Sequence, residues 1–147
     1  MFWRKVIGFW KSILVIGAIT YVSLLREPNV SLPQLVGIDK WIHGVMYFLL
    51  TLTLLWDSQT LECHYGSNGS NGAPKQKLWW IVFAFSVIYG GFIEVLQELF
   101  FYPRTGDWWD WLADCIGVII AIVVWLIGIK LYEKRMVFGG FSEDSRC

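Results

Sequence analysis

Seven residues with chemically active side chains lie between two long apolar segments in the second half of the chain. They comprise five carboxylates, one amide and one guanidinium: Glu94, Gln97, Glu98, Arg104, Asp107, Asp110 and Asp114. A charged side chain at the centre of a bilayer costs roughly 2.5–3.5 kcal/mol on insertion scales. Each of these groups therefore needs a partner, a proton, a cation or water. This segment is the first candidate for a functional site.

A turn at residues 102–106 separates the two apolar segments, with Pro at 103 and Gly at 106. These residue types favour turns, so the sequence predicts an antiparallel pair of helices on either side. The side chains expected to face one another at similar depth across this pair are Glu94, Gln97, Asp110 and Asp114, with Arg104 at the rim. Asp107 follows a glycine and precedes an apolar helix, so helix capping is sufficient to explain it.

An earlier apolar segment supplies a second set of polar side chains. Lys40, His43 and Tyr47 recur at positions i, i+3 and i+7, which share one face of a helix. We predict that this face meets the helix pair in one polar pocket. Its expected members are Lys40, His43, Tyr47, Glu94, Gln97, Arg104, Asp110 and Asp114.

The composition indicates the kind of protein that positions these groups. The 147 residues are enough for one domain, and 56% of them are hydrophobic, with ten tryptophans and a mean hydropathy of +0.51. Charged residues make up only 16%, and they cluster at the edges of the apolar segments. We therefore predict an all-α, four-helix polytopic integral membrane bundle. The zero formal net charge gives no support for a nucleic-acid partner.

Four apolar segments define the expected helices of a single domain over 1–147. Their predicted bounds are 6–25, 39–56, 78–100 and 107–132. Residues 57–77 are polar, with a low-complexity centre rich in Gly, Ser and Asn, so we expect a flexible loop there.

The distribution of Lys and Arg predicts the orientation in the membrane. Four spans place both termini on one side, and that side carries most of the basic residues: Arg4, Lys5, Lys75, Lys77, Lys130, Lys134 and Arg135. The positive-inside rule then places both termini in the cytoplasm. The polar residues of the predicted pocket converge on the outer face, a convergence that supports a single site.

The first motif resembles that of a known family. Asp39-Lys40-x-x-His43-x-x-x-Tyr47 resembles the D-K-x-x-H-x-x-x-Y signature of the VanZ-like membrane proteins. The remaining polar positions resemble the E-x-x-Q…R…D-x-x-x-N-x-x-G pattern of the same family, through Glu94, Gln97, Arg104, Asp110 and Gly117. The chain departs from the pattern at Asp114, where the family usually has Asn.

The resemblance implies a bacterial cell-envelope protein of the cytoplasmic membrane, and the family's founding member is associated with low-level resistance to the glycopeptide teicoplanin. We favour a non-catalytic protein in which Lys40 and Arg104 hold the anionic headgroup of a lipid or cell-wall precursor. One alternative is a membrane enzyme that acts on a lipid-linked phosphate or acyl group, with His43 and the carboxylates as acid/base groups or as metal ligands. The chain lacks the nucleophile elbow and H-E-x-x-H signatures such an enzyme could carry.

Another alternative is an accessory subunit of a larger membrane complex. The expected partners are thus membrane lipids, an envelope precursor or other membrane subunits. No cofactor and no metal are predicted, because the Cys63-His64 pair lacks further ligands nearby in the sequence.

Overall fold

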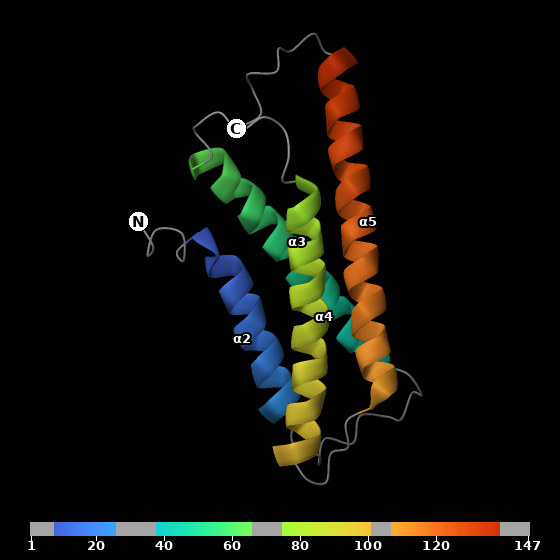
Figure 1. Ribbon diagram of the computed structural model, residues 1–147. Helices are drawn as coiled ribbons and strands as arrows, with labels where there is room; N and C mark the ends of the chain where they lie inside the picture. The colour runs from blue at the N-terminus through green and yellow to red at the C-terminus, as the bar shows by residue number, and fades with distance from the viewer. Residues whose placement is uncertain (1–7, 26–37, 66–74, 101–106, 139–147) are drawn as a thin grey trace.

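The computed structural model describes residues 8–25, 38–65, 75–100 and 107–138. Within these ranges the chain forms four helices: α2 (Trp10–Leu25), α3 (Ile38–Tyr65), α4 (Lys75–Phe100) and α5 (Trp108–Phe138) (Figure 1). The predicted all-α, four-helix class is confirmed. The expected turn at 102–106, including Arg104, lies outside the described residues.

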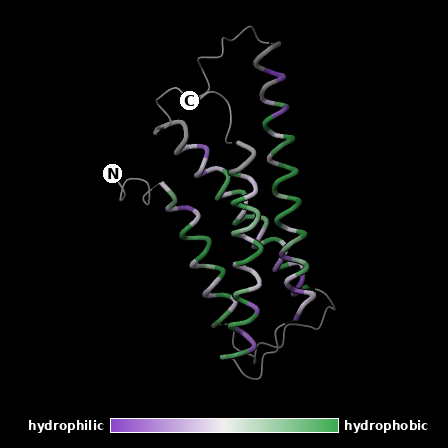
Figure 2. The backbone as a smooth tube through the Cα atoms, viewed as in Figure 1, coloured by the Kyte–Doolittle hydropathy of each residue, from purple (hydrophilic) through white to green (hydrophobic). Residues whose placement is uncertain are grey.

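The four helices run along one another and bring distant parts of the chain to one end of the bundle. Figure 1 shows the last turn of α2, the first turn of α3, the last turn of α4 and the first turn of α5 together at the lower end. We call this the polar end, because it carries Lys40, Glu94, Asp107 and Asp110. In α5 the hydrophobic residues dominate the middle of the helix and hydrophilic ones lie toward its two ends (Figure 2).

Three of the helices have the length and composition of membrane spans: Ile38–Thr60, Leu78–Phe100 and Trp108–Tyr132. Helix α2 is also apolar, but its 16 residues extend about 24 Å at 1.5 Å per residue. That is shorter than a hydrocarbon core of about 30 Å. The prediction that this segment also spans the membrane therefore stays a prediction.

The bundle exposes large apolar side chains and buries polar ones. Ile88 and Phe100 are 70% and 71% exposed, whereas the fully buried side chains include Thr51, Asp57, Ser86 and Asp114. A lipid environment explains this distribution, because apolar side chains lose nothing by facing acyl chains while polar groups gain by finding partners inside. The apolar core is shared by all four helices: it includes Tyr47 and Leu50 of α3, Ile19 of α2, Val82 of α4 and Val118 of α5.

The predicted bounds of the flexible loop, 57 and 77, are both wrong. Helix α3 continues from the apolar segment through Asp57 to Tyr65, and α4 begins at Lys75. The helix does not end at Asp57 because this carboxylate is buried against α2, where Ser12 donates two hydrogen bonds to it. Likewise α5 continues past the predicted residue 132 to Phe138.

Helices α3 and α5 share the most extensive interface of the bundle. Their backbones approach closely at Gly44 and Gly117. The approach is so close that a Cβ placed on Gly117 would clash with the carbonyl oxygen of Gly44. Small residues permit such close approach between membrane helices. The contact lies one turn beyond the polar end and brings polar side chains of the two helices within hydrogen-bonding distance.

Candidate functional site

The outermost part of the site is a lysine held between two aspartates. Lys40 on α3 donates hydrogen bonds from Nζ to Asp107 Oδ2 at 2.8 Å and to Asp110 Oδ1 at 3.1 Å. Asp110 is buried, whereas the side chains of Lys40 and Asp107 are each 42% exposed. We call these three residues the outer layer.

Asp107 has several roles at the start of α5. Its Oδ1 accepts a hydrogen bond from the Trp109 amide, which caps the helix as the sequence predicts. Its own amide donates to Glu94 Oε2 at 3.1 Å and so links α5 to α4. The ammonium group of Lys40 lowers the pKa of the Asp107 carboxyl, so this aspartate stays ionised at neutral pH.

An inner layer of three residues from three helices lies behind the outer one. His43 Nδ1 on α3 is 3.2 Å from Asp114 Oδ1 on α5 and 3.8 Å from Glu94 Oε1 on α4. All three side chains are buried, and Asp114 is only 1% exposed. An imidazole therefore shares one buried space with two carboxylates.

Three buried oxygen atoms in or beside the inner layer lack a hydrogen-bond partner among the described residues: Glu94 Oε1, Asp114 Oδ2 and Tyr47 Oη. Asp114 Oδ2 faces Gly90 of α4, where an added Cβ would lie 2.9 Å from it. A buried polar atom without a partner costs about 1–3 kcal/mol. The inner layer therefore contains more hydrogen-bond acceptors than the described residues use.

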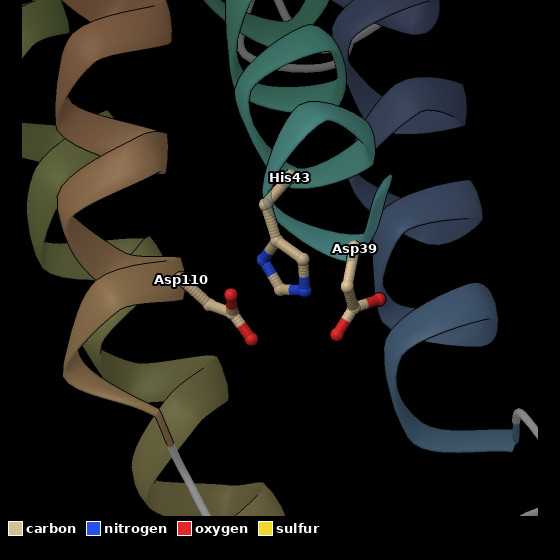
Figure 3. A group of neighbouring side chains, drawn as sticks. All are labelled: Asp39, His43 and Asp110. Carbon is tan, nitrogen blue, oxygen red and sulfur yellow. The ribbon is translucent and has the colours of Figure 1, made fainter. Parts of the chain in front are cut away.

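The ring of His43 also lies between two carboxylates at the edge of the site. Figure 3 shows Asp39 and Asp110 on opposite sides of the ring, with one ring nitrogen toward each side. Potential ligand atoms of these three residues lie within 4.8 Å of one another. His43 of the inner layer therefore lies close to Asp110 of the outer layer as well as to Asp39.

An apolar groove of about 340 Å³ runs along α3 and α5 from the polar end. Lys40 lies at its polar end, and its remaining lining is apolar or glycine: Trp41, Gly44, Val45, Phe48, Ala113, Ile116, Gly117 and Ile120. The close approach at Gly44 and Gly117 forms part of its wall. A charged group at one end of an apolar groove matches the two parts of an amphiphilic molecule.

The structure brings together five of the predicted site residues: Lys40, His43, Glu94, Asp110 and Asp114. Tyr47 lies one turn further along α3, fully buried beside the inner layer. Gln97 differs from expectation, because its amide donates to the Ser23 carbonyl at 3.0 Å and joins α4 to the end of α2. Arg104 lies outside the described residues.

Sequence reasoning missed two residues of the site. Asp39 begins the predicted span and the family motif but is not among the predicted pocket residues, although it lies one turn before His43 on the same helix. Asp107 was explained as a helix cap, although its spacing to Asp110 and Asp114 is also that of one helix face. Both spacings can be read from the sequence, and each indicates residues that share one face of a helix.

The charge balance limits what the site can bind. Among the described residues its side chains comprise five carboxylates, one lysine and one histidine: Asp39, Glu94, Asp107, Asp110, Asp114, Lys40 and His43. Lys40 can neutralise part of the outer layer, but its contacts do not extend to the inner carboxylates. The arrangement therefore favours protons and cations in the inner layer and a mixed-charge ligand at the outer one.

The comparison with known protein families gives one result. The sequence model of the VanZ/LLP1 family matches residues 3–129, a stretch that includes every residue of both layers and of the groove. No curated protein and no solved structure gives a significant match to the chain.

Proposed function

The chain belongs to the VanZ/LLP1 family, and we propose that it is a non-catalytic, multi-pass protein of the bacterial cytoplasmic membrane. In this proposal it binds an amphiphile of the cell envelope, either an anionic lipid or a lipid-linked cell-wall precursor. Its physiological role is then to alter the access of glycopeptides or enzymes to such molecules, in line with the resistance that the family resemblance implies.

The observation that carries the proposal is the apolar groove that begins at Lys40. Its volume of about 340 Å³ and its apolar lining suit part of an acyl or isoprenoid chain. Three of the helices have the length and composition of membrane spans, so lipid chains reach this groove directly from the bilayer. A chain lying along α3 and α5 would place its headgroup at the outer layer.

Lys40 can bind that headgroup without losing its present partners. An ammonium group has three N–H donors, and the outer layer uses two of them, for Asp107 and Asp110. The side chain is 42% exposed, so the third donor is accessible to a phosphate oxygen. The flanking carboxylates can accept hydrogen bonds from hydroxyl or amino groups of the same headgroup.

The proposal includes an orientation with both termini in the cytoplasm and the polar end toward the outer leaflet. A single cysteine at position 70, in a variant without the three native cysteines, tests it with a membrane-impermeant thiol reagent. We expect labelling only after the membrane is opened. Labelling from outside intact cells contradicts the orientation and moves the polar end to the cytoplasmic leaflet.

Photo-cross-linking with an anionic phospholipid that carries a diazirine on its acyl chain tests the groove. We expect cross-links on α3 and α5, which Ile120→Trp reduces by filling the groove. The matched control is Ile119→Trp, because Ile119 and Ile120 are 50% and 49% exposed but only Ile120 lines the groove. Lys40→Met is expected to remove the preference for an anionic over a neutral phospholipid.

Two results overturn the proposal. Equal cross-linking in the Ile120→Trp and Ile119→Trp proteins means that the lipid contacts the general apolar surface and not the groove. Turnover of a lipid-linked phosphate or acyl ester by the purified protein contradicts the non-catalytic part of the proposal and favours the enzyme alternative.

A further inference from the structure

We propose that His43, Glu94 and Asp114 form a binding site for one divalent transition-metal ion, of the class of Zn²⁺ or Mn²⁺. The three residues come from α3, α4 and α5, so a bound ion would join the three helices that have the length and composition of membrane spans. The site is distinct from the groove and does not depend on the amphiphile proposed to bind there.

The ligand set has the chemistry of such a site. Imidazole nitrogen and carboxylate oxygen are ordinary ligands of Zn²⁺ and Mn²⁺. Their potential ligand atoms all lie within 4.8 Å of one another. Two ligands each about 2.0–2.2 Å from a tetrahedral ion are roughly 3.3–3.6 Å apart. The separations of 3.2 and 3.8 Å from His43 Nδ1 to the two carboxylates lie close to that range.

An independent observation points to a ligand in this space. Asp114 Oδ2 and Glu94 Oε1 are buried and have no hydrogen-bond partner, although Asp114 is only 1% exposed and Glu94 8%. Buried polar groups are ordinarily satisfied. A cation held by both oxygens of the Asp114 carboxylate and by Glu94 Oε1 would satisfy the two unpartnered atoms, which no neighbouring donor in the described part of the chain does.

Charge balance selects a cation of charge two. With a neutral imidazole and both carboxylates ionised, as metal binding requires, the three side chains would carry a charge of −2 in a buried space. Lys40 is the nearest described permanent cation, and both of its ion pairs go to the outer layer. A divalent ion would remove the repulsion between Glu94 and Asp114 without requiring any movement of the outer layer.

The surroundings of the histidine suit a metal ligand. The carboxylates of Asp39 and Asp110 flank the ring (Figure 3). A carboxylate beside the ring nitrogen that does not bind the metal commonly fixes the orientation of a ligating histidine. With three protein ligands, a fourth position of a tetrahedral ion would remain open to water or to a ligand atom.

The test measures Zn²⁺ binding to the purified full chain in detergent after treatment with EDTA, by competition with a chromophoric chelator. We expect one Zn²⁺ per chain and a rise in unfolding temperature on binding. Loss of an outer-shell partner typically weakens metal binding about 10- to 100-fold. We therefore expect Glu94→Gln and Asp114→Asn, which each remove a ligand, to weaken it by about 100-fold or more.

Matched variants separate this site from other carboxylates. Glu98→Gln makes the same chemical change as Glu94→Gln one turn away at an exposed position, and Asp57→Asn changes a buried carboxylate outside the site. Both are expected to retain the affinity of the unmodified protein. Ile120→Trp is also expected to retain it, so failure of the groove proposal and failure of the metal proposal give different results.

The proposal is overturned if the unmodified protein binds no stoichiometric Zn²⁺ and no Mn²⁺ at micromolar concentrations. It is equally overturned if Glu94→Gln and Asp114→Asn, checked for folding by circular dichroism and gel filtration, bind as tightly as the unmodified protein. That second result would assign the ion to other residues and leave a proton to balance the inner layer.

Discussion

The bundle buries carboxylates in two regions, and the two are satisfied to different degrees. Asp57, in the half of α3 remote from the polar end, accepts hydrogen bonds from the Ser12 amide at 3.1 Å and the Ser12 hydroxyl at 2.8 Å. Its other oxygen lies 3.5 Å from Lys11 Nζ. In the inner layer, Glu94 and Asp114 share His43, and two of their oxygens have no hydrogen-bond partner in the part of the chain that the structure describes.

The difference indicates that the two regions use buried charge differently. Asp57 stabilises the contact between α2 and α3, whereas the inner layer keeps acceptor oxygens that a ligand can use. Around Asp57 one oxygen accepts both hydrogen bonds from Ser12. The other has no hydrogen-bond partner among the described residues, but it lies 3.5 Å from Lys11 Nζ, so one positive charge faces one carboxylate where α2 meets α3. In the inner layer the acceptors exceed the donors. A protein that needed the inner layer only to hold its helices together would gain from replacing one carboxylate by a neutral group.

Gly117→Ala is expected to have the largest effect, and it acts on the α3–α5 contact beside the inner layer and the groove, not on the region of Asp57. The added methyl group meets the Gly44 carbonyl, so α3 and α5 must separate. We expect a loss of about 3 kcal/mol in unfolding free energy, the upper end of the usual cost of overpacking. Chemical denaturation in mixed micelles measures it.

Gly128→Ala is the control for this change, because a Cβ at Gly128 on the same helix meets nothing within 4 Å. Alanine is the better helix former, so this variant should be neutral or up to about 1 kcal/mol more stable. Equal stability of the two variants would mean that the glycine contact does not hold the inner layer together.

The sequence predicted the polar end well because its signals are local. The i, i+3 and i+7 spacing of Lys40, His43 and Tyr47 defines one helix face without knowledge of the fold. The short stretch with Pro103 and Gly106 between two apolar segments predicts an antiparallel pair with Glu94 opposite Asp114. Those relations depend on helix geometry and on a short connection, and both can be read from neighbouring residues.

The remainder depends on contacts between distant segments. Asp57 was assigned to a loop because a carboxylate after an apolar segment ordinarily ends a span, and Ser12 and Lys11 lie more than forty residues away. Lys11 lies beside Asp57 and the ring of Trp56, and no local pattern in the sequence predicts this contact between α2 and α3. The groove could not be predicted either, because it arises from the packing of Gly44 against Gly117.

Asp57→Asn is expected to have an intermediate effect. The amide can accept from Ser12 through one oxygen, but the hydrogen bonds lose their charge assistance and Lys11 loses its counter-charge. Hydrogen bonds to charged groups contribute about 1.5–3 kcal/mol, and we expect a loss of stability toward the lower end of that range because Lys11 is 40% exposed.

Ser12→Ala sharpens the interpretation of this variant. It removes the hydroxyl donor and keeps the amide donor, so it should cost less than Asp57→Asn if the charge on Asp57 matters. An equal or greater cost in thermal unfolding would show that the Ser12 hydroxyl accounts for the contact.

Asp114→Asn is expected to have the smallest effect on the metal-free protein, and it tests the comparison directly. Asp and Asn are nearly isosteric, so the substitution preserves packing while it removes charge. It weakens the contact with His43 at 3.2 Å but also removes the repulsion from Glu94. These changes oppose each other, and we expect a net change within about 1 kcal/mol, the value of one neutral hydrogen bond. Thermal unfolding of this variant and of Asp57→Asn, at neutral pH in the presence of EDTA, measures the change.

A loss of roughly 3–5 kcal/mol, as when a buried ion pair is broken, would mean that Asp114 is an ionised partner of His43. The inner layer would then be a structural contact of the same kind as Asp57 with Ser12 and Lys11.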